Sequence, residues 1–238
     1  MLAALLVLAS TAAVPPEGTL AEVDRAGSRA KDAVIVLSVE VVERAGEPLQ
    51  RTLKLWQLGT RSRMVKFLDP ARLRGTGILV PEPGQTMLYL PAYKRVRRIV
   101  GKEGGEAFMG TGFSIGDLAR VRFSDDYTPS VLSEATDVIT LKLVPKQPGE
   151  HKHASIRLTV RKADHLVAKV ELLDASGAVL RAIAMSDFRA AGAYTLAHRI
   201  EIDEPAAQKR TTAKITEVRF DIGLSADDFT ERSLTRAP

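Results

Sequence analysis

The chain has 238 residues, of which 45% are hydrophobic and 26% are charged. This composition is typical of a folded protein, and the length suffices for one large β domain or two small ones. Cysteine is absent, which excludes disulfide bonds, thiolate metal sites and cysteine nucleophiles. The formal net charge of +5 suits an anionic membrane surface or a nucleic acid but is diagnostic of neither.

The first residues resemble an export signal. The stretch MLAALLVLASTAAVPPEG joins an apolar run, Leu2 to Ala9, to small residues and two prolines. This order is typical of a secretory signal peptide, and the run is too short to span a bilayer. We therefore expect residues 1–13 to be a signal peptide cleaved near Ala12 or Ala13; an apolar N-terminal end without a targeting role is the alternative. Without a cysteine to acylate, we expect an exported protein that carries no lipid anchor.

One helix is predicted near the N-terminus, over residues 18–33. Thr19 is the candidate N-cap, with Glu22 three residues later as its capping-box partner. Leu20, Val23 and Ala26 then share one apolar stripe.

Most of the remaining chain predicts strands, because apolar and polar residues alternate between short turn signals. In the first half the predicted strands cover residues 33–44, 49–59, 61–70, 74–82 and 86–91. In the second half they cover residues 137–146, 153–162, 166–174, 179–192, 193–203 and 211–223. Roughly ten such strands predict a mainly β fold with one antiparallel sheet. So wide a sheet must curl, split or close. Short helices are expected at residues 115–121 and within the C-terminal residues 225–234, and residues 18–238 are expected to form one domain.

The sequence does not support several common site motifs. The stretch GKEGGEAFMGTG matches neither GxxxxGK(S/T) nor GxGxxG, the two glycine spacings of phosphate-binding loops. The antiparallel pattern also lacks the βαβ unit in which such loops occur. His151 and His153 could share a strand face, but no third metal ligand is clearly placed. There is no GxSxG motif to support serine hydrolase chemistry. We therefore expect no enzyme activity, no cofactor and no metal.

A cluster of cations follows the strand at residues 86–91. The stretch YKRVRRIV contains Lys94, Arg95, Arg97 and Arg98. One such cluster is weak evidence for a nucleic-acid-binding surface, and we expect no nucleic acid as a partner. The functional interpretation is contact with anionic lipid headgroups or a partner protein. The alternative is a solvated strand face with Val96 and Ile99 turned inward.

Three stretches in this order resemble the outer-membrane lipoprotein-sorting protein family, the LolA-like proteins of Gram-negative bacteria. They are RSRMVKFLDPARLRGTGILV, MLYLPAYKRVRRI and FMGTGFSIGDL, and the closing LSADDFTERSL is similar as well. The resemblance covers about residues 33–234. One departure stands out: this chain has Gly112 where the family usually has an aspartate, while Asp117 is retained.

The resemblance implies an incomplete antiparallel β-barrel with helices as a lid over an apolar cavity. It also implies a monomeric, non-catalytic periplasmic carrier that moves lipoprotein acyl chains or other lipids from an inner-membrane transporter toward an outer-membrane acceptor. An accessory lipid-binding subunit of an inner-membrane exporter of the RND type is the alternative. Residues 101–112 would form a mobile loop leading to the helix at Ile115. The residues expected to line or close the cavity are Trp56, Phe67, Leu88, Leu90, Phe108, Met109, Phe113 and Leu118. The four cations would form a basic rim that contacts a partner.

Overall fold

The computed structural model describes residues 15–44, 46–99, 108–119, 122–149 and 151–238. Within these ranges, thirteen strands form one antiparallel sheet in the order β6-β5-β4-β3-β2-β1-β13-β12-β11-β10-β9-β8-β7. The expected signal peptide (residues 1–13), the glycine-rich residues 101–107 and the end of the predicted second helix (residues 120–121) lie outside the described residues.

The first half of the chain forms six strands. These are β1 (Asp32–Glu43), β2 (Leu49–Leu58), β3 (Ser62–Asp69), β4 (Gly77–Val80), β5 (Thr86–Leu90) and β6 (Arg95–Ile99). The second half forms β7 (Tyr127–Glu134), β8 (Val138–Pro145), β9 (Ser155–Arg161), β10 (Val167–Leu173), β11 (Val179–Ala191), β12 (Tyr194–Glu204) and β13 (Lys209–Phe220). The alternating pattern thus predicts most of the strands; it does not predict β7, and it indicates β6 only as a possible strand face.

The sheet consists of two meanders joined along one seam. β1 pairs with β13, from Ala33 opposite Phe220 to Glu43 opposite Lys209. One meander runs outward from β1 to β6, and the other returns from β7 to β13, so β6 and β7 are the two edges. The chain between β6 and β7 must therefore join opposite edges of the sheet.

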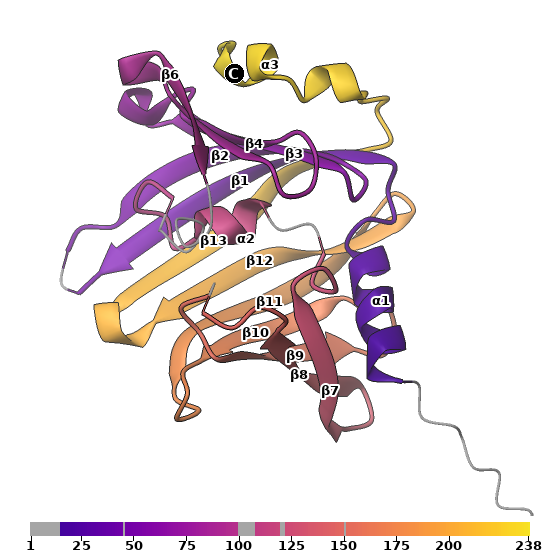
Figure 1. The fold of residues 1–238 in the computed structure, drawn as a ribbon. Helices are drawn as coiled ribbons and strands as arrows, with labels where there is room; N and C mark the ends of the chain where they lie inside the picture. Colours follow the sequence, from indigo (N-terminus) through magenta and orange to yellow (C-terminus); the bar gives the residue numbers. More distant parts are fainter. Residues whose placement is uncertain (1–14, 45, 100–107, 120–121, 150) are drawn as a thin grey trace, which may run out of the picture.

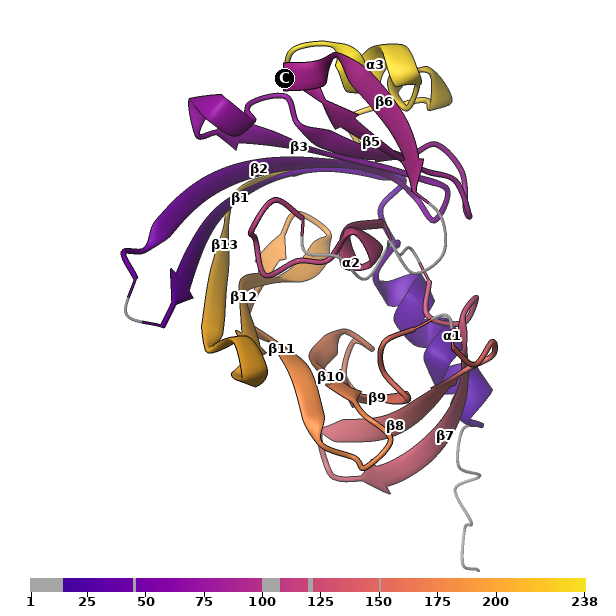
Figure 2. The same ribbon diagram turned by 60° about the vertical axis from the view of Figure 1, so that its left-hand side comes forward.

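The sheet curls into an arc that does not close (Figures 1 and 2). The connection between the edges carries helix α2 (Ile115–Ala119) inside the arc, beneath β1, β2 and β3. Helix α1 (Pro16–Ala26) lies beside β7. Helix α3 (Glu231–Thr235) packs on the outside, above β4. The concave side is thus the side that α1 and α2 cover.

Each face of the sheet has its own apolar cluster. The larger cluster fills the concave side, with side chains from all thirteen strands, from both inner helices and from residues 108–113. The smaller one lies on the convex side of β2 to β6, where Met64 and Leu79 pack against Phe229 and Leu234 of the C-terminal segment. The β2 to β5 strands are therefore apolar on both faces.

Helix α1 begins and ends earlier than predicted. It starts at Pro16, after Pro15 as N-cap, and ends at Ala26 before Gly27. Proline at the first helical position is preorganised for a helix start. Thr19 therefore lies within the helix, and the predicted Thr19–Glu22 capping box is wrong. The predicted apolar stripe is confirmed, because Leu20, Val23 and Ala26 are all buried and the first two belong to the concave core.

A buried lysine attaches the C-terminal helix to the sheet. Lys66, on the convex side of β3, is 2% exposed. Its Nζ donates to the carbonyl oxygens of Ser233 at 2.6 Å and Arg236 at 2.8 Å. Burial, together with the charge of Arg236, lowers the pKa of Lys66 to about 8. This ammonium satisfies carbonyl groups at the end of α3 that have no partner within the helix.

Candidate functional site

Apolar side chains extend across the whole width of the concave face, with a few charged side chains among them. Successive antiparallel strands place side chains of the same register on the same face. The fully buried members include Val39, Val41, Leu53, Val65, Phe67, Leu141, Leu143, Ile156, Leu158, Val160 and Ile202. Partly exposed apolar side chains continue this surface, including Ile35, Leu55, Met185, Ile200 and Ile215. The concave side of the arc is therefore an apolar trough. The segments that fill it are α1, α2 and residues 108–113.

Residues 108–113, the inner loop, occupy part of this trough. The Phe108 N–H donates to the Phe113 carbonyl at 2.8 Å, and the Thr111 hydroxyl donates to the Phe108 carbonyl at 2.7 Å. The Phe108 ring lies 5.0 Å, between centroids, from that of Phe67 on β3. Although the sequence predicted a mobile loop here, the described part is a hydrogen-bonded turn packed on the sheet.

Gly112 makes the closest approach of the inner loop to the sheet. A Cβ placed there would lie 2.8 Å from the Cβ of Thr211 on β13 and closer still to its hydroxyl. Thr211 is fully buried and belongs to the β1–β13 seam, so it has little room to move. No side chain, and least of all the aspartate usual in the resembling family, fits at this position.

A buried ion pair attaches α2 to the concave face. Asp117 first caps its own helix, because its Oδ2 accepts from Ser114 N at 2.8 Å while the Ser114 hydroxyl accepts from Asp117 N at 3.0 Å. The same Oδ2 lies 2.6 Å from Arg181 Nη1 of β11. Arg181 also donates to the Gly112 carbonyl. Its side chain is only 10% exposed, so this one guanidinium holds both α2 and the inner loop.

A second polar group holds both inner helices. Arg63 of β3 donates from Nη1 to the Leu118 carbonyl of α2 at 3.3 Å and from Nη2 to Gln57 Oε1 at 2.8 Å. Gln57 in turn donates to the Gly27 carbonyl, just past α1, at 3.3 Å. Burial lowers the pKa of Arg63 to about 10, which still leaves it charged at neutral pH.

The structure brings most of the expected cavity residues together. Phe67, Leu88, Phe108, Phe113 and Leu118 are buried in the concave core, and Leu90 and Met109 pack against it partly exposed. Trp56 does not join them. It packs with the convex cluster, and the Lys54 ammonium lies 4.9 Å from its ring centroid. Trp56 is therefore separated from the trough by the sheet.

The four expected rim cations lie at the β6 edge but not on one face. All four are exposed. Arg97 is paired with Leu88, and Arg95 with Leu90, so both share the concave register. Arg98 is paired with Met87 and has the convex register, while Lys94 occupies the left-handed turn before the strand.

The alternative interpretation of this strand was wrong in one respect. Val96 packs with the convex cluster and Ile99 with the concave core, so the two do not share an inward face. Both faces of β6 contribute to packing because the C-terminal segment covers the convex side.

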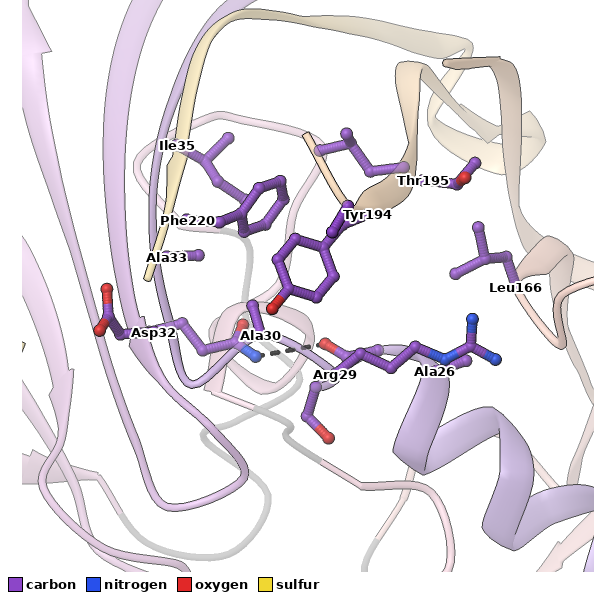
Figure 3. A pocket seen from close by; sticks show the side chains of 15 residues that line it. Ala26, Arg29, Ala30, Asp32, Ala33, Ile35, Leu166, Tyr194, Thr195 and Phe220 are labelled. Atoms are coloured by element: carbon purple, nitrogen blue, oxygen red, sulfur yellow. Dashed lines mark hydrogen bonds between the residues drawn. The ribbon is translucent and has the colours of Figure 1, made fainter. Parts of the chain in front are cut away.

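A small pocket remains at one end of the trough (Figure 3). Its volume is about 180 Å³. It lies between the end of α1, the start of β1, the β11–β12 hairpin and the end of β13. Phe220, Ala33 and Ile35 form one wall in this view, and Leu166 and Thr195 lie opposite. Small-molecule sites usually measure about 300–1,000 Å³, so this pocket is smaller than most of them.

The histidine pair noted in the sequence packs against an aromatic ring. The His151 and His153 rings stack 5.0 Å apart, and His153 Nε2 lies 2.9 Å from the Tyr127 hydroxyl. Within the described ranges, no group of three or more side chains is arranged to hold a metal ion. In the same part of the chain, no helix has the length and apolar character needed to cross a bilayer.

Arg181 and Arg63 were not predicted from the sequence. Arg181 stands in register with Ile183 and Met185 in the stretch VLRAIAM, where alternation assigns an inward position to a charged residue. Arg63 likewise alternates with Val65 and Phe67. A charge on the apolar face of a strand is costly unless it is paired, so such positions could have been identified as internal anchors.

A mainly β sheet curled around helices on its concave side defines the fold class, and solved structures share it. A domain described as an outer membrane lipoprotein-sorting protein, from Vibrio parahaemolyticus, is 24% identical with a TM-score of 0.80, over 91% of this chain and 97% of that one. A LolA superfamily protein from Nitrosomonas europaea is 18% identical with a TM-score of 0.78, over 93% and 100%. A DUF1329 family protein from Desulfovibrio piger is 20% identical with a TM-score of 0.81, over 92% and 99%.

Sequence comparison gives the family. Residues 59–236 match the model of a family described as an uncharacterized protein, and the chain belongs to this family. The solved structures show that its fold is LolA-like. No curated protein has a significant match to the chain. The predicted LolA-like fold, a mainly β sheet that forms an incomplete barrel, is confirmed.

Proposed function

We propose that this protein is a non-catalytic periplasmic carrier that binds the acyl chains of lipoproteins or other lipids in the concave trough and moves them toward the outer membrane. The observation that supports this most is the continuous apolar face of the sheet, covered by elements that a few polar contacts hold in place. Phe67, Leu88, Leu90, Phe108, Met109, Phe113 and Leu118 are the proposed contacts of the cargo.

The energetics favour such a role. Burying one methylene group is worth about 0.8 kcal/mol, so a long acyl chain gains roughly 10 kcal/mol in a fitting trough. In the structure the inner loop and α2, together called the cover, occupy that space, and Phe108 and Phe113 are buried in it. This arrangement is the covered form. Cargo and cover therefore compete for the same apolar surface, and the cover must move when a chain binds.

The basic β6 edge is the proposed contact surface. Lys94, Arg95, Arg97 and Arg98 are exposed at the end of the sheet where the connection to α2 begins. Such an edge suits the anionic surface of an inner-membrane transporter, an outer-membrane acceptor or lipid headgroups. The same feature also suits the second candidate function, an accessory lipid-binding subunit of an inner-membrane exporter. We propose an exported, unanchored monomer in either case.

Fatty-acid binding by the delipidated protein tests the carrier function. Palmitate should displace a fluorescent fatty acid from the wild-type protein. Leu90→Glu places a carboxylate on the concave side of β5 and should weaken palmitate binding by about tenfold or more. Tyr93→Glu is the matched control, since Tyr93 is 72% exposed and lies in the adjacent turn. Absence of binding by the wild-type protein would contradict the proposal, and equal binding by Leu90→Glu would remove Leu90 from the site.

A further inference from the structure

The pocket at the end of the trough has apolar walls and a polar frame. Ala33 and Ile35 of β1, Phe220 of β13, Leu166 before β10 and Leu196 of β12 supply hydrocarbon surface. Tyr194 stands beside Phe220, with their ring centroids 4.8 Å apart. Its hydroxyl donates to Asp221 Oδ2 at 2.5 Å, and Asp221 also accepts from Lys31 N at 2.8 Å. Tyr194 is thus tied across the pocket to the turn after β13.

Most of the polar side chains of the frame bond within the protein. Asp32 accepts from the backbone N–H groups of residues 222, 223 and 224 at 2.8–3.1 Å. The Ser28 hydroxyl donates to the Asp24 carbonyl at 2.9 Å. Gln57 donates to the Gly27 and Gly59 carbonyls and accepts from Arg63. A polar ligand would have to displace these bonds, whereas an apolar ligand would leave them intact.

The pocket borders the apolar core of the trough. Ile35 lines the pocket and also packs against the concave core. Leu196 and Tyr194 share the inward register of β12 with Ile200 and Ile202, which pack in that core. A cavity of about 150 Å³ with aliphatic and aromatic walls stays dry and accommodates benzene, so this one suits on the order of six carbon atoms.

We propose that this pocket receives the terminal hydrocarbon segment of an acyl chain whose remainder lies in the trough, and that Tyr194 closes over it. This inference rests on the proposed carrier function and adds to it the place where the chain ends. The bound segment is a saturated hydrocarbon without polar substituents, because most polar side chains of the frame bond within the protein and Ile35, Leu166 and Phe220 offer apolar contacts.

A filled pocket tests the proposal. Ala193 lines the pocket from the exposed β11–β12 turn, so Ala193→Trp adds a large ring there. Ala207→Trp is the matched control, because Ala207 is an exposed alanine in the short 3₁₀ turn between β12 and β13, outside the pocket. Palmitate and the shorter laurate are titrated against the wild-type protein and both variants, after circular dichroism and thermal unfolding confirm that each is folded.

Ala193→Trp should weaken palmitate binding by about tenfold or more and weaken laurate much less, because only the longer chain reaches the pocket. Ala207→Trp should leave both affinities within about twofold. In addition, palmitate with a photoreactive diazirine at its methyl end should label peptides that contain Tyr194 or Ile35. Equal loss for both acids, or labelling confined to peptides far from the pocket, would overturn the inference while leaving the carrier function standing. No binding of either acid to the wild-type protein would refute the carrier function itself.

Discussion

The Arg181–Asp117 ion pair should control how readily α2 and the inner loop leave the trough. Arg181→Met removes the guanidinium and keeps an unbranched side chain of similar reach. Asp117 then remains largely buried with one backbone N–H as its partner, and the Gly112 carbonyl loses a donor. Breaking a buried ion pair on one side costs about 3–5 kcal/mol. Because the two side chains are 10% and 16% exposed, we expect the lower end, about 3 kcal/mol.

This loss of stability should affect α2 and the inner loop rather than the sheet. Hydrogen exchange of amides in residues 113–118 should speed up by about 100-fold, while exchange in β8 and β9 should change little. If cargo competes with the cover, palmitate affinity should rise by about tenfold or more, because less of the protein is held in the covered form. Arg189→Met on the same strand is the control, since the Arg189–Asp187 pair is 62% and 41% exposed. Unchanged exchange at α2, or weaker palmitate binding, would contradict this role of the ion pair.

Three other changes test separate parts of the account. Gly112→Ala should destabilise the protein by about 1–3 kcal/mol in urea unfolding through overpacking, whereas Gly27→Ala, whose Cβ has ordinary contacts, should be nearly neutral; equal effects would contradict the close approach. Lys66 has a folded pKa of about 8 against about 10.5 unfolded, so the unfolded state binds more protons between these values. The stability advantage of wild type over Lys66→Met should therefore grow from pH 7 to pH 10, by about 3 kcal/mol at most, and a shrinking advantage would contradict the burial argument. Arg95→Glu with Arg98→Glu should weaken binding to anionic lipid vesicles and leave palmitate capacity unchanged; a loss of capacity with intact vesicle binding would reverse the assigned roles.

Local pattern was enough to predict most strands, because a strand with one apolar face alternates with period two. The same pattern could not assign faces where both sides are apolar. In the stretch LKLWQL, Leu55 and Trp56 are both apolar, and only the pairing with neighbouring strands shows that Leu55 faces the trough and Trp56 the convex side. That convex face is apolar because the distant C-terminal segment covers it, which no local pattern contains.

The site was predictable in composition but not in arrangement. The aromatic residues of FMGTGF were expected near the cavity, yet the contact of Gly112 with Thr211 joins positions far apart in the sequence. The role of Arg181 depends equally on β11 lying opposite α2 across the trough, which follows from the strand order. Alternation can mark such a residue as inward-facing, but only the folded sheet identifies its partner.

The most direct test of the carrier function is native mass spectrometry of the mature protein purified from a bacterial periplasm, followed by lipid extraction. We expect a co-purifying acylated species, or uptake of added lipid or lipopeptide by the delipidated protein, that Leu90→Glu reduces and Tyr93→Glu does not. A clean apo mass that persists in the presence of added acyl ligands would contradict it and would favour the accessory-subunit function, with the basic β6 edge as the place to search for a protein partner.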